Sequence, residues 1–376
     1  MKILSKIQLT ALLAAAMTFA ASCSKDSAED VLKPVRFENA PQGEISALAT
    51  GATKQDPVTD QILKEYVVTY EKSSMFDEAD LIKGDGIGRN LLYPASILRG
   101  SSFMQGQYDP LVLTNKFKPV TIFIDIKGIT TGKVYEENVY PGNSDINQAV
   151  NHLLNQNGGH IPSSYIRTNY TYECDSVSTS ESFKETINIH TKANVPGIVG
   201  AEFYYEDSQA ATGDEKYVLV KLKQYVYTVG IDPFYKWVEG GLMASECGEY
   251  EPVYISSVNY GRVAYLLIQT KATTAETRKM VNASIDLLVG GIGGSANVAY
   301  NNEFKRLFNE DKIKVSIQGG PAMVITGYDS FINHMKEMDF LTIISRPISF
   351  TVTRLKDNTQ VEMVNYYTDI VKEYRP

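Results

Sequence analysis

The side chains that most often carry catalysis are few in this sequence and follow no catalytic spacing. Among the four histidines, neither an H-E-x-x-H spacing nor a neighbouring cysteine pair indicates a metal site. The glycine-rich segment 84–88 lacks the G-x-G-x-x-G spacing and the Lys-Ser/Thr pair of a phosphate loop, so it predicts a turn. A hydrolase using acid pairs such as Glu71 and Asp77 is the weakest alternative. We therefore expect no enzyme, no metal and no cofactor.

The first of three cysteines follows a segment typical of an export signal. Lys2 and Lys6 precede an apolar run, 9–21, which is too short to span a membrane as a helix with ordinary flanks. The run ends in Ala20-Ala21-Ser22-Cys23, a pattern similar to a bacterial lipobox. We expect removal of residues 1–22 and lipidation of Cys23, giving an outer-membrane lipoprotein that is periplasmic, displayed on the cell surface or released. The alternative is a simple secretory signal followed by an unrelated cysteine.

Cys174 and Cys247 are the two remaining cysteines. Export into an oxidising compartment permits them to form a disulfide. Two separate buried thiols are the alternative, and the sequence leaves both open.

Length and charge limit the remaining classes. A chain of 376 residues with 43% apolar residues can bury a substantial core in two or three folding units. A formal net charge of −8 provides no basic surface for a nucleic-acid backbone, so nucleic acid is not an expected partner. Residues 23–58 are rich in small, polar and acidic side chains and are interpreted as a flexible tether.

Strand and helix patterns are mixed along the chain. Runs of β-branched and aromatic residues predict strands at 65–70, 120–126, 217–229 and 254–270. Apolar residues at helical spacing predict helices at 145–155 and 329–338. Because strands and helices do not alternate regularly, the fold class is α+β.

Two segments have patterns unlike those of an ordinary globular domain. Apolar and polar residues alternate along 187–195, and 280–299 begins as a helix pattern but becomes apolar and glycine-rich. They form either a half-buried strand and a loop, or hairpins that cross a bilayer, for which about 9 to 11 alternating residues per strand suffice. The apolar residues expected to enter the membrane are Ile187, Ile189, Ala193, Val195, Leu287, Leu288, Val289 and Ile292.

Six sequence blocks together resemble those of the thiol-activated, cholesterol-dependent cytolysins, in the same order. They are RTNYT at 167–171, LKQYVYTV at 222–229, PVYISSVNYGR at 252–262, Gly319-Gly320, LYPASIL at 92–98 and PISFT at 347–351. The resemblance implies an elongated multidomain protein with a central twisted antiparallel sheet flanked by two helical clusters. These clusters, at about 175–214 and 273–312, would unfold into two membrane hairpins.

The resemblance also implies domain boundaries. It implies a linker domain (59–78 and 348–376), a scaffold domain (79–174, 223–265 and 321–347) and a pore-forming domain (175–222 and 266–320).

Several residue roles follow from the same resemblance. Gly319 and Gly320 are expected to form a hinge that frees an edge strand. Tyr170 matches an oligomerisation aromatic whose partner position in the neighbouring subunit is occupied by Ile313. Tyr260, Gly261 and Arg262 are interpreted as a structural motif rather than a ligand site.

The sequence departs from the family pattern after the strand-like segment 361–367. The resemblance implies a tryptophan-rich membrane-recognition domain after this segment, for which we expect no counterpart, and the single tryptophan, Trp237, lies elsewhere. The expected function is pore formation at a membrane lipid surface by a homo-oligomer or a hetero-oligomer with a longer cytolysin-like partner, without inferred cholesterol recognition. The alternative is a non-inserting scaffold or binding lipoprotein, a regulatory or immunity partner of a longer protein.

Overall fold

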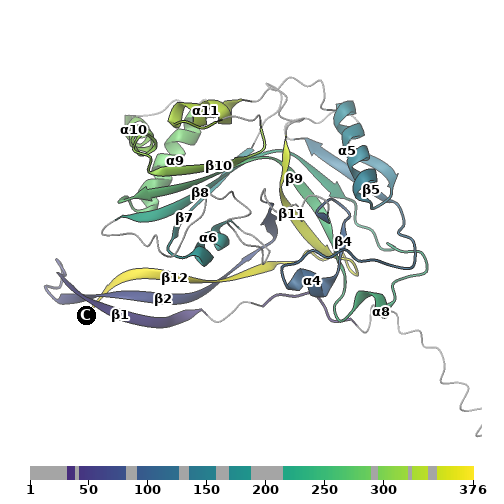
Figure 1. The fold of residues 1–376 in the computed structure, drawn as a ribbon, viewed down its shortest axis with the longest axis horizontal. Helices are drawn as coiled ribbons and strands as arrows, with labels where there is room; N and C mark the ends of the chain where they lie inside the picture. Colours follow the sequence, from purple (N-terminus) through teal and green to yellow (C-terminus); the bar gives the residue numbers. More distant parts are fainter. Residues whose placement is uncertain are drawn as a thin grey trace, which may run out of the picture.

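Two long antiparallel strands, β8 (Lys216–Ile231) and β9 (Val253–Thr270), run through the centre of the protein (Figure 1). The computed structural model describes residues 32–38, 42–81, 91–126, 135–157, 169–187, 215–288, 295–320, 324–337 and 345–376. Both strands are rich in β-branched and aromatic residues, and both are buried along most of their length. They form the spine of a nine-stranded sheet.

The spine has different neighbours at its two ends. At one end β8 pairs with β5 (Val120–Ile126), which pairs with β6 (Tyr135–Val139), and β9 pairs with β4 (Ile97–Leu98) and β11 (Arg346–Arg354). The short strand β3 (Glu78–Asp80) continues the sheet beyond β11. At the other end β8 pairs with β7 (Asn169–Val177), and β9 pairs with β10 (Ile313–Gln318). The sheet therefore has a scaffold half and a four-stranded half, β7-β8-β9-β10.

Gly261 marks the point on β9 where its partner changes from β11 to β10. The β11 ladder ends at the pair Arg346 and Gly261, and the β10 ladder begins at the pair Gln318 and Val263. A Cβ atom on Gly261 would lie 2.0 Å from the backbone oxygen of Gln224 on β8. Only glycine permits this approach of the two central strands. This close approach accounts for the glycine of the Tyr260-Gly261-Arg262 motif.

Helices cover the four-stranded half on both faces (Figure 1). Helices α9 (Thr274–Leu288), α10 (Ser295–Asn309) and α11 (Tyr328–Lys336) pack on one face over Val218, Val220 and Leu222. Helix α6 (Ser180–Thr186) lies on the opposite face, over Leu219 and its neighbours. Alternate β8 residues thus contact different clusters, as the period of a strand requires.

The remaining helices belong to the scaffold half. Helix α5 (Asn143–Asn157) packs its apolar face on β5, whereas α4 (Gly100–Met104) and α8 (Ala244–Cys247) are single short turns. None of the helices in the described ranges combines the length and the apolar character that a membrane-spanning helix needs.

A separate three-stranded sheet extends beneath α6 (Figure 1). It contains β1 (Gly43–Gln55), β2 (Ile62–Phe76) and β12 (Met363–Arg375), in the order β1-β2-β12. Two predictions about its extent are wrong. Residues 43–55, assigned to a flexible tether, form a strand paired with β2. Residues 348–354, assigned to the linker domain, belong to β11 of the large sheet, because β11 pairs with β9.

The α+β fold class with a large antiparallel sheet is confirmed, and so are the six predicted elements. The strand prediction at 120–126 coincides with β5. The helices predicted at 145–155 and 329–338 lie within two residues of α5 and α11.

The close approach at Gly261 gives a first prediction. Gly261→Ala places a methyl group against the Gln224 carbonyl, so the free energy of unfolding should fall by about 1–3 kcal/mol, the usual cost of overpacking. Gly43→Ala is the matched control, because no atom lies within 4 Å of its added Cβ. Urea unfolding followed by circular dichroism measures both. Equal stability of the two variants would contradict this account of the bend.

Candidate conformational site at the sheet bend

Gly319 and Gly320 follow β10 directly and pack against the bend. Their φ angles are +80° and +83°, a region that favours glycine. A Cβ on Gly319 would lie 2.2 Å from the backbone oxygen of Gly261, so two glycines meet across the sheet. The structure therefore brings together the predicted hinge and the predicted structural motif at one point.

Arg262, the next residue of β9, is fully buried and binds the end of α11. Its Nε donates to Oε1 of Gln224 at 2.8 Å, and its Nη2 donates to the carbonyl oxygens of Met335 and Glu337 at 3.2 and 2.8 Å. Its Nη1 donates to the carbonyl of His334. These carbonyls lie at the C-terminal end of α11, where the helix dipole favours a cation. Burial lowers the pKa of Arg262.

Tyr170 joins the edge strand β7 to the same network. Its hydroxyl donates to the Met335 carbonyl at 2.9 Å and accepts from Nε2 of Gln224 at 2.6 Å. Four elements, β7, β8, β9 and α11, thus meet in one set of polar contacts. We call Tyr170, Gln224, Arg262 and the C-terminal carbonyls of α11 the bend network.

Ile313 lies at the opposite end of the four strands from Tyr170. It pairs with Ile268 on β9, whereas Tyr170 lies in the row of Gln224 and Arg262. The Ile313 side chain is buried in the apolar cluster beneath α9, α10 and α11. The structure therefore does not bring the two predicted oligomerisation residues together within one chain.

His334 on α11 is buried beside the bend network. Neither ring nitrogen has a hydrogen-bond partner among the described residues, and a Cβ on Gly320 would lie 3.3 Å from Nε2. Burial, followed by the charge of Arg262, lowers the pKa of His334, while Glu337 opposes this shift. The folded environment therefore favours the neutral imidazole where α11 packs against the hinge.

Buried charges lie on the opposite face of the four-stranded half. Lys221 Nζ contacts Asp80 Oδ2 at 3.0 Å and Glu173 Oε2 at 2.6 Å. Lys223 Nζ contacts Asp80 Oδ1 at 2.5 Å and Glu78 Oε1 at 3.0 Å. Burial opposes the charge of Lys223, but Asp80 and Glu78 raise its pKa well above the usual range. The pairs with Asp80 and Glu78 bind β8 to the short strand β3, and the pair with Glu173 binds β8 to β7.

Helix α6 contacts the three-stranded sheet through polar groups at its start. Ser178 Oγ donates to Oδ1 of Asp369 on β12 at 2.5 Å and accepts from the backbone N–H of Ile370 at 2.8 Å. Thr179 Oγ1 donates to the Thr368 carbonyl at 2.6 Å, and Thr179 also caps α6 through the N–H of Ser182. Helix α6 is thus held between two sheets.

The expected membrane-inserting residues are only partly covered by the structure. Ile187 is buried at the end of α6, in the cluster beneath that helix. Leu287 and Leu288 lie in the last turn of α9, and their side chains fall outside the description. Residues 189, 193, 195, 289 and 292 lie outside the described residues, as does Cys23.

The disulfide between Cys174 and Cys247, one of the two possibilities that the sequence left open, is not formed. Both are free buried thiols, Cys174 in the cluster beneath α9–α11 and Cys247 in the scaffold cluster around β5. Burial raises the pKa of Cys174 to about 12, which makes it an unreactive thiol. The alternative of two separate thiols is therefore correct.

Sequence reasoning named Tyr170 and Arg262, but it missed Gln224 and the α11 carbonyls of the bend network and all of the buried charges. The one available signal was Lys221 and Lys223, which alternate with apolar residues in an otherwise buried strand. Polar residues at alternate positions normally indicate a solvent-exposed face, whereas here the lysines are paired with carboxylates.

The architecture, a sheet half enclosed by two helical clusters and joined to a thin three-stranded sheet, defines a cytolysin-like fold. The human-specific toxin intermedilysin superposes with a TM-score of 0.63 at 17% identity, covering 93% of this chain and 75% of that one. Listeriolysin O superposes with a TM-score of 0.61 at 18% identity, covering 93% and 72%. At these identities the likeness is one of fold.

The sequence comparison identifies the family. The model of the thiol-activated cytolysins matches residues 64–374, so the chain belongs to this family. Tetanolysin of Clostridium tetani is 25% identical over 336 residues, which cover 82% of this chain and 59% of tetanolysin. Pneumolysin of Streptococcus pneumoniae is 25% identical over 339 residues, which cover 83% of this chain and 67% of pneumolysin. The thiol-activated cytolysins are non-enzymatic pore-forming toxins, and this chain spans 59% of the length of tetanolysin.

His334 gives a second prediction. Because its pKa is lowered in the folded state, the unfolded chain binds the extra proton below the ordinary pKa of about 6.5, and the contribution of His334 to stability falls as pH decreases. We expect a loss of up to about 1.4 kcal/mol for each pH unit between about 6.5 and the lowered folded value. Unfolding curves at pH 7 and pH 5 measure this loss.

One variant identifies the residue responsible. His334→Leu removes the titrating ring and should reduce the pH dependence. An identical pH dependence in His334→Leu and the parent chain would exclude His334 as the source.

Proposed function

We propose that this protein is an exported, lipid-anchored pore former that oligomerises and inserts amphipathic β-hairpins into a target membrane. The observation that carries the proposal is the position of the helical clusters in the chain. Each cluster connects two adjacent antiparallel strands: 178–215 connects β7 to β8, and 271–312 connects β9 to β10.

Converting either cluster into a hairpin would extend strand pairs that already exist. The two connections contain 38 and 42 residues, enough for two membrane-crossing strands each, since about 9 to 11 residues cross a bilayer. No strand order has to change. The alternating residues Ile187, Ile189, Ala193 and Val195 would face lipid, with Leu287, Leu288, Val289 and Ile292 in the second hairpin.

The bend network supplies a mechanism for exposing the edge of β10. In this proposal Gly319 and Gly320 rotate, α11 leaves Arg262 and Tyr170, and unpaired backbone groups on β10 become available to another subunit. The edge strand β7 of the neighbour would pair with them. Because Tyr170 and Ile313 lie at opposite ends of the four strands, their contact requires neighbouring subunits to be offset along the strand direction.

A disulfide lock tests hairpin release. Ser178→Cys with Asp369→Cys should join the segment before α6 to β12, because Ser178 Oγ and Asp369 Oδ1 are 2.5 Å apart. The oxidised variant should release less than a tenth of the dye that the parent chain releases from liposomes, and reductant should restore release. The control pair Thr69→Cys with Ile370→Cys links two strands of one sheet and should leave release unchanged.

The same experiment distinguishes pore formation from the alternative function. Burial of Ile313 beneath three helices, where the family carries an edge aromatic, favours a non-inserting binding or regulatory lipoprotein. That alternative predicts no leakage and no oligomer from the mature chain, alone or mixed with a longer cytolysin-like partner. Equal leakage from oxidised and reduced locked protein would contradict insertion of α6.

Lipid anchoring is proposed from the lipobox-like Ala20-Ala21-Ser22-Cys23. In a bacterial host that processes lipoproteins, the parent chain should partition into the membrane fraction and incorporate radiolabelled palmitate. Cys23→Ser should lose the label and become soluble, whereas Cys247→Ser, a change at a buried thiol, should retain it. Labelling of Cys23→Ser at the parental level would contradict the assignment.

A further inference from the structure

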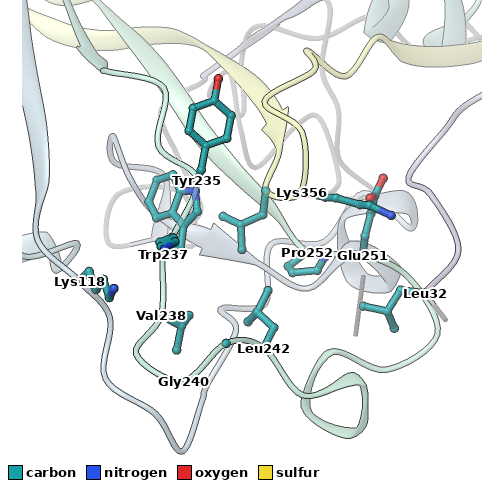
Figure 2. A pocket seen from close by; sticks show the side chains of 13 residues that line it. Leu32, Lys118, Tyr235, Trp237, Val238, Gly240, Leu242, Glu251, Pro252 and Lys356 are labelled. Atoms are coloured by element: carbon teal, nitrogen blue, oxygen red, sulfur yellow. The ribbon is translucent and has the colours of Figure 1, made fainter. Parts of the chain in front are cut away.

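A cavity of about 380 Å³ lies in the scaffold half, apart from the bend (Figure 2). Trp237 and Val238 line one side, and Leu242, Pro252 and Leu355 contribute further apolar surface. Leu32, from the N-terminal segment that runs beside Tyr250, also lines it. A volume of this size fits a small ligand.

The walls of the cavity are built from paired backbone segments. The Lys118 N–H donates to the Trp237 carbonyl at 2.8 Å, and the Glu239 N–H donates to the Lys116 carbonyl at 3.0 Å. Trp237 packs against Tyr254 with ring centroids 4.5 Å apart. Gly240 and Gly241, with φ angles of +77° and +86°, turn the chain around the opening. The cavity is thus part of the fixed scaffold.

Positive charge gathers at this cavity in a protein that is acidic overall. Three lysines line it, Lys118, Lys236 and Lys356, against one carboxylate, Glu251. That carboxylate is already engaged, because it accepts from the Val35 N–H at 3.0 Å and lies 3.8 Å from Arg354. Lys118 and Lys236 form no salt bridge within the described ranges.

The indole N–H of the buried Trp237 is a further donor that lacks an acceptor among the described residues. Trp237 is 3% exposed, and its indole N–H has no acceptor among the residues that the structure describes. A buried donor without a partner costs about 1–3 kcal/mol, so such groups are rare unless a ligand or water satisfies them. An indole N–H can only donate, and lysines can only donate.

We propose that this cavity binds a small amphipathic anion, a molecule with a carboxylate, sulfate or phosphate group and an apolar body. The anionic oxygens accept from the Trp237 N–H and pair with Lys118 and Lys236. The apolar body packs against Val238, Leu242 and Leu355. The site is independent of hairpin insertion, because none of its lining residues belongs to β7, β10 or the helices that cover them.

The chain provides its own reporter for this site, since Trp237 is its only tryptophan. Titration of the mature chain with octanoate should produce a saturable change in tryptophan fluorescence, with binding confirmed by calorimetry. Octanamide, which has the same body without the charge, and inorganic sulfate, which has charge without the body, should each bind at least tenfold more weakly. No saturable change with octanoate up to 10 mM, or equal binding of octanamide, would overturn the proposal.

Variants identify the groups responsible. Lys118→Gln with Lys236→Gln should weaken octanoate binding at least tenfold, whereas Lys116→Gln, an exposed lysine that does not line the cavity, should not. Trp237→Phe keeps an aromatic ring but removes the donor, and should weaken binding several-fold by calorimetry. Parental circular dichroism spectra and melting temperatures verify folding. Unchanged affinity in the folded double lysine variant would contradict the site.

Experiments with lipid vesicles show whether the bound anion is a membrane lipid or a soluble molecule. A fluorescence change with phosphatidylglycerol vesicles, absent with phosphatidylcholine vesicles and lost in the lysine variant, would identify an anionic membrane lipid. A response to octanoate alone would identify a soluble anion. Because neither measurement requires leakage, failure here and failure of pore formation are separate results.

Discussion

The contact between Gly261 and Gly319 fixes where the central sheet changes partners. On the scaffold side of this contact β9 pairs with β11, and beyond it β9 pairs with β10. With any side chain at either position, the backbone of β8 or of the segment after β10 would have to move. The position of Arg262, and therefore the attachment of α11, depends on this approach, because the guanidinium reaches the helix end from the residue next to Gly261.

The two faces of the four-stranded half are held by different interactions. Beneath α9, α10 and α11 lies a large apolar cluster, with Arg262 as its buried cation. On the α6 face, the lysines of β8 meet the carboxylates of β3, and hydroxyls of the α6 start meet β12. Buried ion pairs contribute little net stability because charged groups lose hydration when buried, whereas apolar burial contributes about 25 cal/mol per Å². Separating the polar contacts on the α6 face therefore costs less free energy than their number suggests, because the separated charges regain hydration.

The sequence predicted the elements that have strong local patterns. β5 and β9 are dense in β-branched and aromatic residues, and α5 combines an apolar stripe with polar residues at its start, so local preference and tertiary structure agree. β1 was missed because its small and polar residues are mostly exposed and resemble a linker, and only its pairing with β2 makes it a strand.

The bend network could be predicted only in part. Tyr170, Arg262 and the adjoining glycines were named from a resemblance, whereas Gln224 and the His334 carbonyl become partners through tertiary contacts that no spacing encodes. The pairing state of the cysteines could not be predicted either, because only the fold places Cys174 and Cys247 in two different clusters.

The central claim is that the segment after β7 becomes a membrane hairpin, and its alternation of lipid-facing residues can be measured directly. Single cysteines at successive positions from 187 to 195, in a chain whose native cysteines are replaced by alanine, would be labelled with an environment-sensitive dye and mixed with liposomes. The account predicts that dye emission rises at Ile187, Ile189, Ala193 and Val195 but not at Asn188, His190 or Asn194. Emission that rises at neighbouring positions alike, or does not change at any position, would contradict it.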